Sequence, residues 1–233
     1  MHELGDLAVR NQWGRTPAIR SPGRVYTHQD LYTSVQKVAT FFTYYGGEGG
    51  TLIDVEPEAQ PEAVLSILGA ARLGAIANLT PTGDGELVVV PAAKEDEYDL
   101  DPDQNGIVYD GYPSGPRFVE WELEVWDGSA RTGPRLEAAP EDGVLRTEDR
   151  TYSHGELLDA ADRVIEENGI EEGTEVAVRA PMGNPGTIAA GIVAPLKVGG
   201  TVLFPGTDDL GDVGVGFGVS EPAAVDPTAV FEA

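Results

Sequence analysis

The sequence repeats itself, and this internal repeat constrains the fold more than any other feature of the chain. The segment VYTHQDLYTSVQKV, at 25–38, aligns without gaps with TYSHGELLDAADRV, at 151–164. The matching positions are Tyr26 with Tyr152, His28 with His154, Leu31 with Leu157 and Val38 with Val164. With small shifts the agreement continues between 49–79 and 172–204. Each copy therefore predicts the same order of structural elements.

The first part of each copy predicts a hairpin followed by a helix. Two short extended runs flank a turn in AIRSPGRVYT and again in GVLRTEDRTYS, which is typical of a β-hairpin. Thr27-x-x-Asp30 and Ser153-x-x-Glu156 then match the capping box, in which a hydroxyl and a carboxylate satisfy free amides at a helix start. Apolar residues follow at helical spacing in both copies.

The second part of each copy predicts a strand, a helix and a further strand. The helix is expected to start after Pro61 or Pro185, because proline suits the first turn. A strand, a helix and a strand with a short return imply a parallel, right-handed unit. The chain is therefore predicted to be an α/β protein with two similar α/β subdomains. The expected division is 1–110 for the first, 111–142 for a loop region with a connecting strand, and 143–233 for the second.

The order of these motifs resembles the large N-terminal domain of AMP-forming acyl-CoA synthetases, in the adenylate-forming superfamily. RTPAIRSPGRVYTHQDLYTSVQKVATFF and then LGAARLGAIANLTP are similar to the opening segment of that domain. YSHGELLDAADRV through IVAPLKVGGTVLFPG is similar to the stretch that follows its phosphate loop. The resemblance covers roughly residues 10–210 and implies a layered αβαβα fold.

Between these two stretches the family carries a phosphate loop, [ST]-S-G-T-[ST]-G-x-P-K-G, whose backbone amides wrap the phosphates of ATP. The corresponding stretch here is IVYDGYPSGPRFVE. The resemblance assigns the remaining phosphate contacts to Gly111, Ser114, Gly115 and Arg117. However, Asp110 puts a negative charge where the anion would sit, and Pro113 removes an amide donor. We interpret the loop as a remnant that now serves as a surface turn.

No catalytic residue and no metal ligand is assigned. His28 and His154 lie at matching positions beside helix caps, so we expect them to be structural. In the family, the groups that bind adenine, ribose and magnesium, and a mobile domain with a catalytic lysine, follow the stretch that this chain resembles. ATP and Mg²⁺ are expected as cofactors only if the chain is a ligase. After the loop, alternation in VEWELEV predicts a strand with Val119, Trp121, Leu123 and Val125 facing inward.

The charge balance indicates the environment of the protein. There are 40 acidic residues against 15 lysines and arginines, a net charge of −25, yet 41% of the residues are hydrophobic. A chain that is acidic but still hydrophobic is typical of a salt-accumulating halophile, because molar salt screens the repulsion within about 3 Å. A mimic of nucleic acid or an acidic partner of a basic protein is the alternative, but the acids are scattered along the chain. Nucleic-acid binding is disfavoured, because the sequence has no stripe of basic residues to neutralise phosphates. No apolar run approaches the ~20 residues of a membrane span. We expect a cytoplasmic protein.

Three functions remain open. The first is an acetyl-CoA synthetase-like homologue of AMP–acid ligases that does not catalyse a reaction by itself. Such a pseudoenzyme would bind a small carboxylate, a nucleotide or a full-length synthetase, or form a homo-oligomer. The second is an ATP-dependent acid–CoA ligase that forms an acyl-adenylate. The third is one half of a split ligase that another chain completes. The degenerate loop favours the first.

Overall fold

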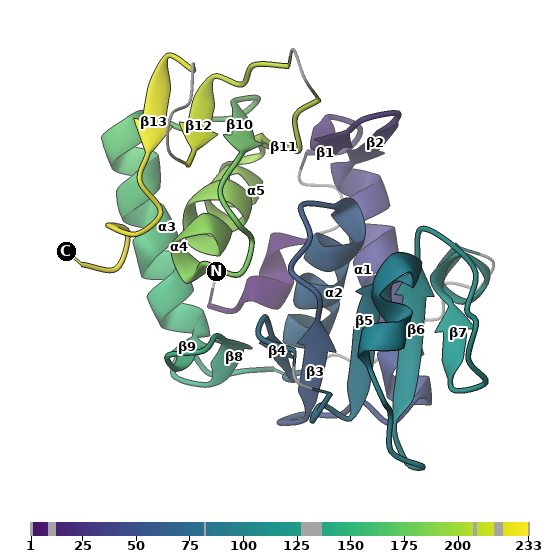
Figure 1. The fold of residues 1–233 in the computed structure, drawn as a ribbon. Helices are drawn as coiled ribbons and strands as arrows, with labels where there is room; N and C mark the ends of the chain where they lie inside the picture. Colours follow the sequence, from purple (N-terminus) through teal and green to yellow (C-terminus); the bar gives the residue numbers. More distant parts are fainter. Residues whose placement is uncertain are drawn as a thin grey trace.

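The computed structural model describes residues 2–8, 13–81, 83–126, 137–206, 209–216 and 221–232. Within these residues the strands form two sheets (Figure 1). The six-stranded sheet has the order β13-β12-β10-β11-β1-β2, and the seven-stranded sheet has the order β7-β6-β5-β3-β4-β8-β9. The strands are β1 (Pro17–Ser21), β2 (Arg24–Thr27), β3 (Leu52–Val55), β4 (Ile76–Asn78), β5 (Leu87–Pro91), β6 (Asn105–Tyr109), β7 (Phe118–Glu120), β8 (Gly143–Arg146), β9 (Thr151–Ser153), β10 (Glu175–Val178), β11 (Thr201–Leu203), β12 (Val213–Val215) and β13 (Ala223–Val225).

The two sheets follow one plan, as the repeat predicts. Parallel strands β13-β12-β10-β11 of one sheet correspond in order to β6-β5-β3-β4 of the other. In each sheet an antiparallel hairpin, β1–β2 or β8–β9, continues the row beside β11 or β4. The prediction of an α/β protein with two similar parallel-rich units is confirmed.

The hairpins, however, are exchanged between the copies. The hairpin from the first copy joins the sheet of the second, where Ile19 of β1 lies opposite Val202 of β11. The hairpin from the second copy joins the sheet of the first, where Leu145 of β8 lies opposite Ala77 of β4. The six-stranded sheet therefore combines strands from both ends of the described chain, and the seven-stranded sheet is built from its middle. The expected domain boundaries at 110 and 142 stay a prediction, and the sheets do not divide along them.

The helices begin where the sequence predicts. They are α1 (His28–Tyr44), α2 (Pro61–Arg72), α3 (His154–Asn168), α4 (Pro185–Thr187) and α5 (Ala194–Val198), with short 3-10 helices η1 (Leu4–Leu7) and η2 (Ala92–Glu97) and π-helical turns η3 (Glu122–Trp126) and η4 (Ile188–Val193). Both capping boxes are confirmed, since the side chains of Thr27 and Ser153 accept from the backbone N–H of Asp30 and Glu156, whose carboxylates accept from the cap N–H in return. Pro61 and Pro185 stand in the first turns of α2 and α4.

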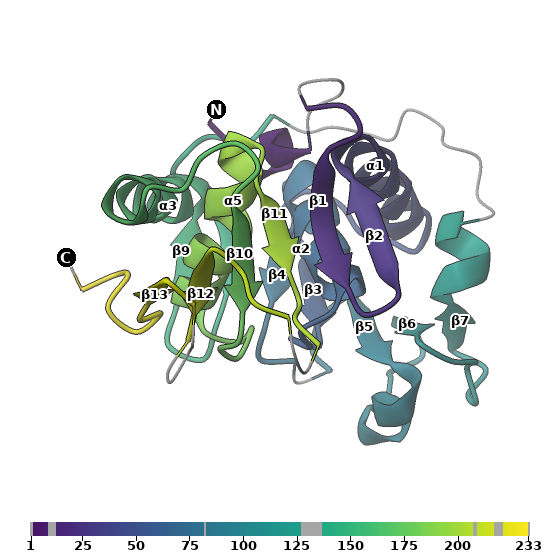
Figure 2. The same ribbon diagram turned by 90° about the horizontal axis from the view of Figure 1, so that it is seen from above.

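Helix α2 forms a buried layer between the sheets. Every one of its residues is buried, and it contacts β3, β4 and β8 of the seven-stranded sheet as well as β1 of the six-stranded sheet. Seen from above, α1 and α3 lie toward opposite sides of the molecule, and α2 and α5 lie between them (Figure 2). Gly69 allows the close approach of α1 to α2, because a Cβ at this position would lie 2.5 Å from Cγ1 of Val38.

One expected element is wrong. The strand predicted through Val125 stops at Glu120, and η3 follows. Trp121 and Val125 are buried but Leu123 is 57% exposed. Positions 121 and 125 are four residues apart, which also places them on one face of a helix, so the apolar pattern fits both structures. No helix in the described part of the chain is long and apolar enough to cross a membrane.

Candidate functional site

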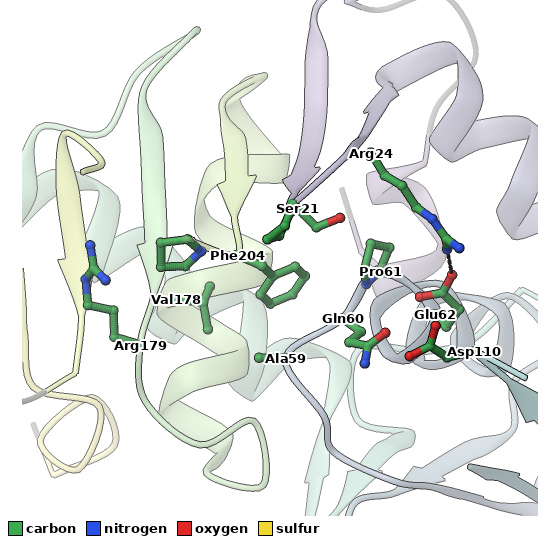
Figure 3. A pocket seen from close by; sticks show the side chains of 12 residues that line it. Ser21, Arg24, Ala59, Gln60, Pro61, Glu62, Asp110, Val178, Arg179 and Phe204 are labelled. Carbon is green, nitrogen blue, oxygen red and sulfur yellow. Dashed lines mark hydrogen bonds and ion pairs between the residues drawn. The ribbon is translucent and has the colours of Figure 1, made fainter. Parts of the chain in front are cut away.

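A cavity of about 720 Å³ lies between the two sheets, and we call it the intersheet cavity (Figure 3). It opens at the carboxyl ends of parallel strands, where open α/β sheets generally bind ligands. The six-stranded sheet contributes residues at or just after the ends of β1, β10 and β11, and the seven-stranded sheet contributes residues that follow β3 and β6. The lining residues are Ser21, Pro22, Arg24, Ala59, Gln60, Pro61, Glu62, Asp110, Val178, Arg179, Phe204 and Pro205.

An ion pair between an exposed arginine and a buried glutamate lies at the edge of this cavity. Nη1 of Arg24 donates to Oε1 of Glu62 at 2.6 Å, and the Glu62 side chain is only 2% exposed. Its second oxygen, Oε2, is buried without a hydrogen-bond partner in the described structure. Burial raises the pKa of the Glu62 carboxyl, while Arg24 opposes the rise. Glu62 stands in the first turn of α2, where the helix dipole favours a negative charge.

Two further carboxylates surround this pair. Asp110 follows β6 and lies beside Glu62 in the cavity wall (Figure 3). Its backbone has a φ of 58°, a left-handed conformation that aspartate adopts more readily than most residues. Its N–H donates to Oε1 of Glu122 at 3.4 Å. The charges of Glu122 and Asp110 add to the rise in the pKa of Glu62, so this end of the cavity is rich in negative charge.

The opposite wall carries the other arginine of the cavity. Nε of Arg179 donates to Oε1 of Glu221 at 2.7 Å, and Nη2 donates to the carbonyl of Asp209 at 2.7 Å. The Glu221 side chain is fully buried. In Figure 3, Arg179 lies on the far side of the cavity from Glu62 and Asp110. Both arginines among the described lining residues are thus already paired with a buried carboxylate.

The predicted phosphate-loop residues lie elsewhere. Ser114, Gly115 and Arg117 line a separate hollow of about 570 Å³ beside η2. Gly111 directly follows Asp110, and a Cβ there would lie 2.7 Å from Cβ of Ala92. The loop therefore starts at the intersheet cavity and runs away from it.

The loop amides bind a carboxylate of the protein itself. The backbone N–H of Ser114 donates to Oε2 of Glu95 at 2.8 Å, and that of Gly115 donates to Oε1 at 2.6 Å. Glu95 is buried, with an exposed fraction of 4%. Nη1 of Arg117 donates to the carbonyl of Pro102 at 2.7 Å. The amides of Ser114 and Gly115 and one guanidinium nitrogen of Arg117, which the resemblance assigns to phosphate, therefore donate to groups of the chain itself.

Sequence reasoning missed Glu95 and Glu62. Glu95 lies in the acidic run KEDEYD, in which nothing distinguishes one acid from the next. Glu62 looks like an ordinary acid in a first helical turn, and only the exchanged hairpin brings Arg24 against it. The sequence identifies Asp110 only as a charge that repels phosphate, because its place in a cavity wall depends on the packing of the two sheets.

Lys94 and His28 have structural partners. Nζ of Lys94 bonds Glu56 at 2.5 Å and Glu58 at 2.6 Å, and these hydrogen bonds raise the pKa of Lys94. Nε2 of His28 lies 3.2 Å from the carbonyl oxygen of Gly200. No group of three or more potential metal-ligating side chains is found in the described ranges.

Comparisons with known proteins agree with this architecture at the level of the fold. No protein-family model matches the sequence, and no curated protein matches it. The anthranilate CoA ligase AuaEII, in complex with anthranoyl-AMP, superposes with a TM-score of 0.79 at 15% identity over 92% of this chain and 49% of that chain. The N-terminal domain of FACL13 from Mycobacterium tuberculosis gives a TM-score of 0.71 at 14% identity, over 93% of this chain and 63% of that chain. The nonribosomal peptide synthetase FmoA3 gives a TM-score of 0.70 at 13% identity, over 86% of this chain and 22% of that chain.

The architecture is therefore that of a two-sheet α/β protein with a cavity at the carboxyl ends of its strands. More specifically, the chain has the fold of the N-terminal domain of adenylate-forming ligases. The resemblance seen in the sequence is confirmed as a resemblance of fold. The chain spans about half the length of the anthranilate CoA ligase that it matches.

Proposed function

We propose that this chain is a non-catalytic protein with the adenylate-forming fold, and that it binds a small molecule in the intersheet cavity. The main support is the pair of hydrogen bonds from the amides of Ser114 and Gly115 to the carboxylate of Glu95. A carboxylate in this place is an internal substitute for the anion that such a loop would otherwise bind.

ATP would have to displace that carboxylate. Leaving a buried polar group without its partner costs about 1–3 kcal/mol, and more for a charged group. Glu95 would lose both donors, and a triphosphate beside it would add repulsion between like charges. Arg117 is the cation that the resemblance assigns to the phosphates, and its guanidinium binds the Pro102 carbonyl. These contacts oppose the binding of phosphate by this loop.

The intersheet cavity also disfavours a polyanion. Its two arginines are paired with Glu62 and Glu221, and Asp110 adds a further negative charge. Its volume of about 720 Å³ lies in the ~300–1,000 Å³ range of small-molecule pockets. A compact ligand without phosphate groups fits this combination of size and charge best.

A second candidate is an acid–CoA ligase that works through an acyl-adenylate, either alone or as half of a split enzyme completed by another chain. The similarity of fold to a CoA ligase in complex with anthranoyl-AMP favours it. This candidate requires the loop to release Glu95 and accept phosphate.

Calorimetric titration with ATP and magnesium in molar potassium chloride separates the two. We expect no measurable ATP binding by the wild-type protein. Glu95→Ala, which frees both amides, should gain affinity for inorganic pyrophosphate, whereas Glu97→Ala should not. Glu97 is an exposed acid of the same short helix and provides the matched control. If the wild type binds ATP with micromolar affinity and Arg117→Ala abolishes this binding, the acid–CoA ligase becomes the better candidate.

A further inference from the structure

Glu62, in the wall of the intersheet cavity, carries a buried acceptor that no residue of the described chain satisfies. Glu62 is 1% exposed and lines the cavity, and its Oε2 is buried without a hydrogen-bond partner. Buried carboxylate oxygens in proteins are nearly always hydrogen-bonded, so an unpaired one points to a missing donor. Arg24 satisfies only the other oxygen, Oε1. A ligand that carries N–H groups would supply what is missing.

The accessible part of this acidic end is Asp110. Its side chain lies beside Glu62 in Figure 3, and the residue is exposed where Glu62 is buried. The end of β6 holds its backbone in place, with a φ of 58°. A cationic group that enters the cavity therefore meets Asp110 first and can then reach toward Glu62.

The charge of the cavity wall that is not paired within the protein has one sign. Among the described residues of the cavity wall, Arg24 and Arg179 are the cations, and each is neutralised by a buried glutamate. Asp110 then contributes a negative charge that neither arginine neutralises. Glu122 lies close enough for its charge to act on Glu62. The uncompensated charge that faces a ligand is therefore negative, which favours a cation over a neutral molecule or an anion.

The other wall is apolar. Val178 and Phe204 are both buried, and together with Pro205 they face the cavity from the six-stranded sheet. In Figure 3 the ring of Phe204 lies between Val178 and the acidic end. A ligand that joins a cationic head to an apolar body would meet both walls.

We propose that the intersheet cavity binds an organic ammonium compound, whose N–H groups donate to Glu62 and Asp110 and whose apolar body packs on Phe204. This inference rests on the proposed function and specifies the ligand class of the same cavity. A metal ion is a poorer fit than an ammonium group, because the described residues form no cluster of three or more metal-ligating side chains.

Three probes of equal chain length test the head group. We would titrate n-hexylammonium, n-hexanol and n-hexanoate into the wild-type protein and follow binding by NMR and calorimetry. Hexylammonium should bind at least about tenfold more tightly than either of the others, since charge-assisted hydrogen bonds are the strong ones. Asp110→Asn should weaken it by about tenfold. Asparagine also tolerates the left-handed backbone, so this variant should fold.

Controls make each outcome decisive. Asp159→Asn removes an exposed acid of α3 and should leave binding unchanged. Glu62→Gln keeps an acceptor for Arg24 and should also weaken hexylammonium. Equal or tighter binding of hexanoate, no binding of hexylammonium, or no effect of Asp110→Asn and Glu62→Gln would overturn the inference. Those results leave the non-catalytic assignment standing, because that assignment falls only if the wild type binds ATP.

Discussion

His154 accepts a hydrogen bond from the backbone N–H of Leu4 at its Nδ1, across 3.0 Å. Its other ring nitrogen, Nε2, is buried without a partner in the described structure. An imidazole that accepts at Nδ1 is neutral and carries its proton on Nε2. Burial lowers the pKa of His154 and outweighs the opposing charges of Glu3, Asp142 and Asp6. Burial also lowers the pKa of His28, at the equivalent place in the repeat.

The protein should therefore lose stability as the pH falls. The folded state keeps these histidines neutral below the ordinary value of 6.5, while the unfolded chain takes up protons there. The free energy of unfolding should decrease as the pH falls below 6.5 and toward the lowered pKa of the folded state. Urea midpoints should fall less in His154→Gln than in the wild type. His2→Gln, at an exposed position, should match the wild type, and parallel curves for all three proteins would contradict this account.

The two capping boxes should contribute equally to stability. Thr27→Ala and Ser153→Ala each remove a hydroxyl that accepts from a free helix-end amide, and each should cost about 1 kcal/mol. The control is Thr33→Ala, because the Thr33 hydroxyl donates to a carbonyl within α1 and satisfies no free amide. Chemical denaturation measures all three. A loss at Thr33 as large as that at the caps would show that the hydroxyls act in some other way.

The exchanged hairpins should make the chain unfold as one unit. Since β1 pairs with β11 and β8 pairs with β4, neither copy of the repeat contains all the strands of a sheet, so neither copy can form its sheet alone. Scanning calorimetry should show a single transition whose calorimetric and van't Hoff enthalpies agree. Ile19→Ala, in the buried part of β1, should lower that transition without splitting it. Two separate transitions would mean that the sheets are independent.

The acidic surface should make stability depend on salt. A net charge of −25 leaves repulsion that dilute buffer screens poorly, and we propose on this basis that the protein works in a halophile. The melting temperature should rise steeply between dilute and molar potassium chloride. An uncharged osmolyte at matched osmolality controls for solute exclusion, which stabilises by another route. An equal rise in both solutions would remove the electrostatic explanation.

Much of the fold follows from local sequence signals. The capping boxes at Thr27 and Ser153 and the prolines at 61 and 185 fix the helix starts, because each acts on backbone amides only a few residues away. The exchange of hairpins was not predictable in this way. Both hairpins carry the same local pattern, and which sheet each one joins depends on contacts far apart in the sequence.

The candidate site was predicted less well for the same reason. The sequence predicts a degenerate loop from Asp110 and Pro113 alone. Its partner Glu95 could not be found, because hydrogen bonds across about twenty residues leave no periodic signal. The strand expected through Val125 was wrong because a spacing of four residues fits a helix as well.

The central claim is that Glu95 holds the loop amides and that the chain does not activate a carboxylate with ATP. The most direct measurement is carboxylate-dependent exchange of labelled pyrophosphate into ATP, with the wild-type protein, magnesium and a series of carboxylates in molar potassium chloride. This account predicts no exchange above the protein-free background with acetate or longer acids. Exchange that requires the carboxylate and disappears in Arg117→Ala would contradict it.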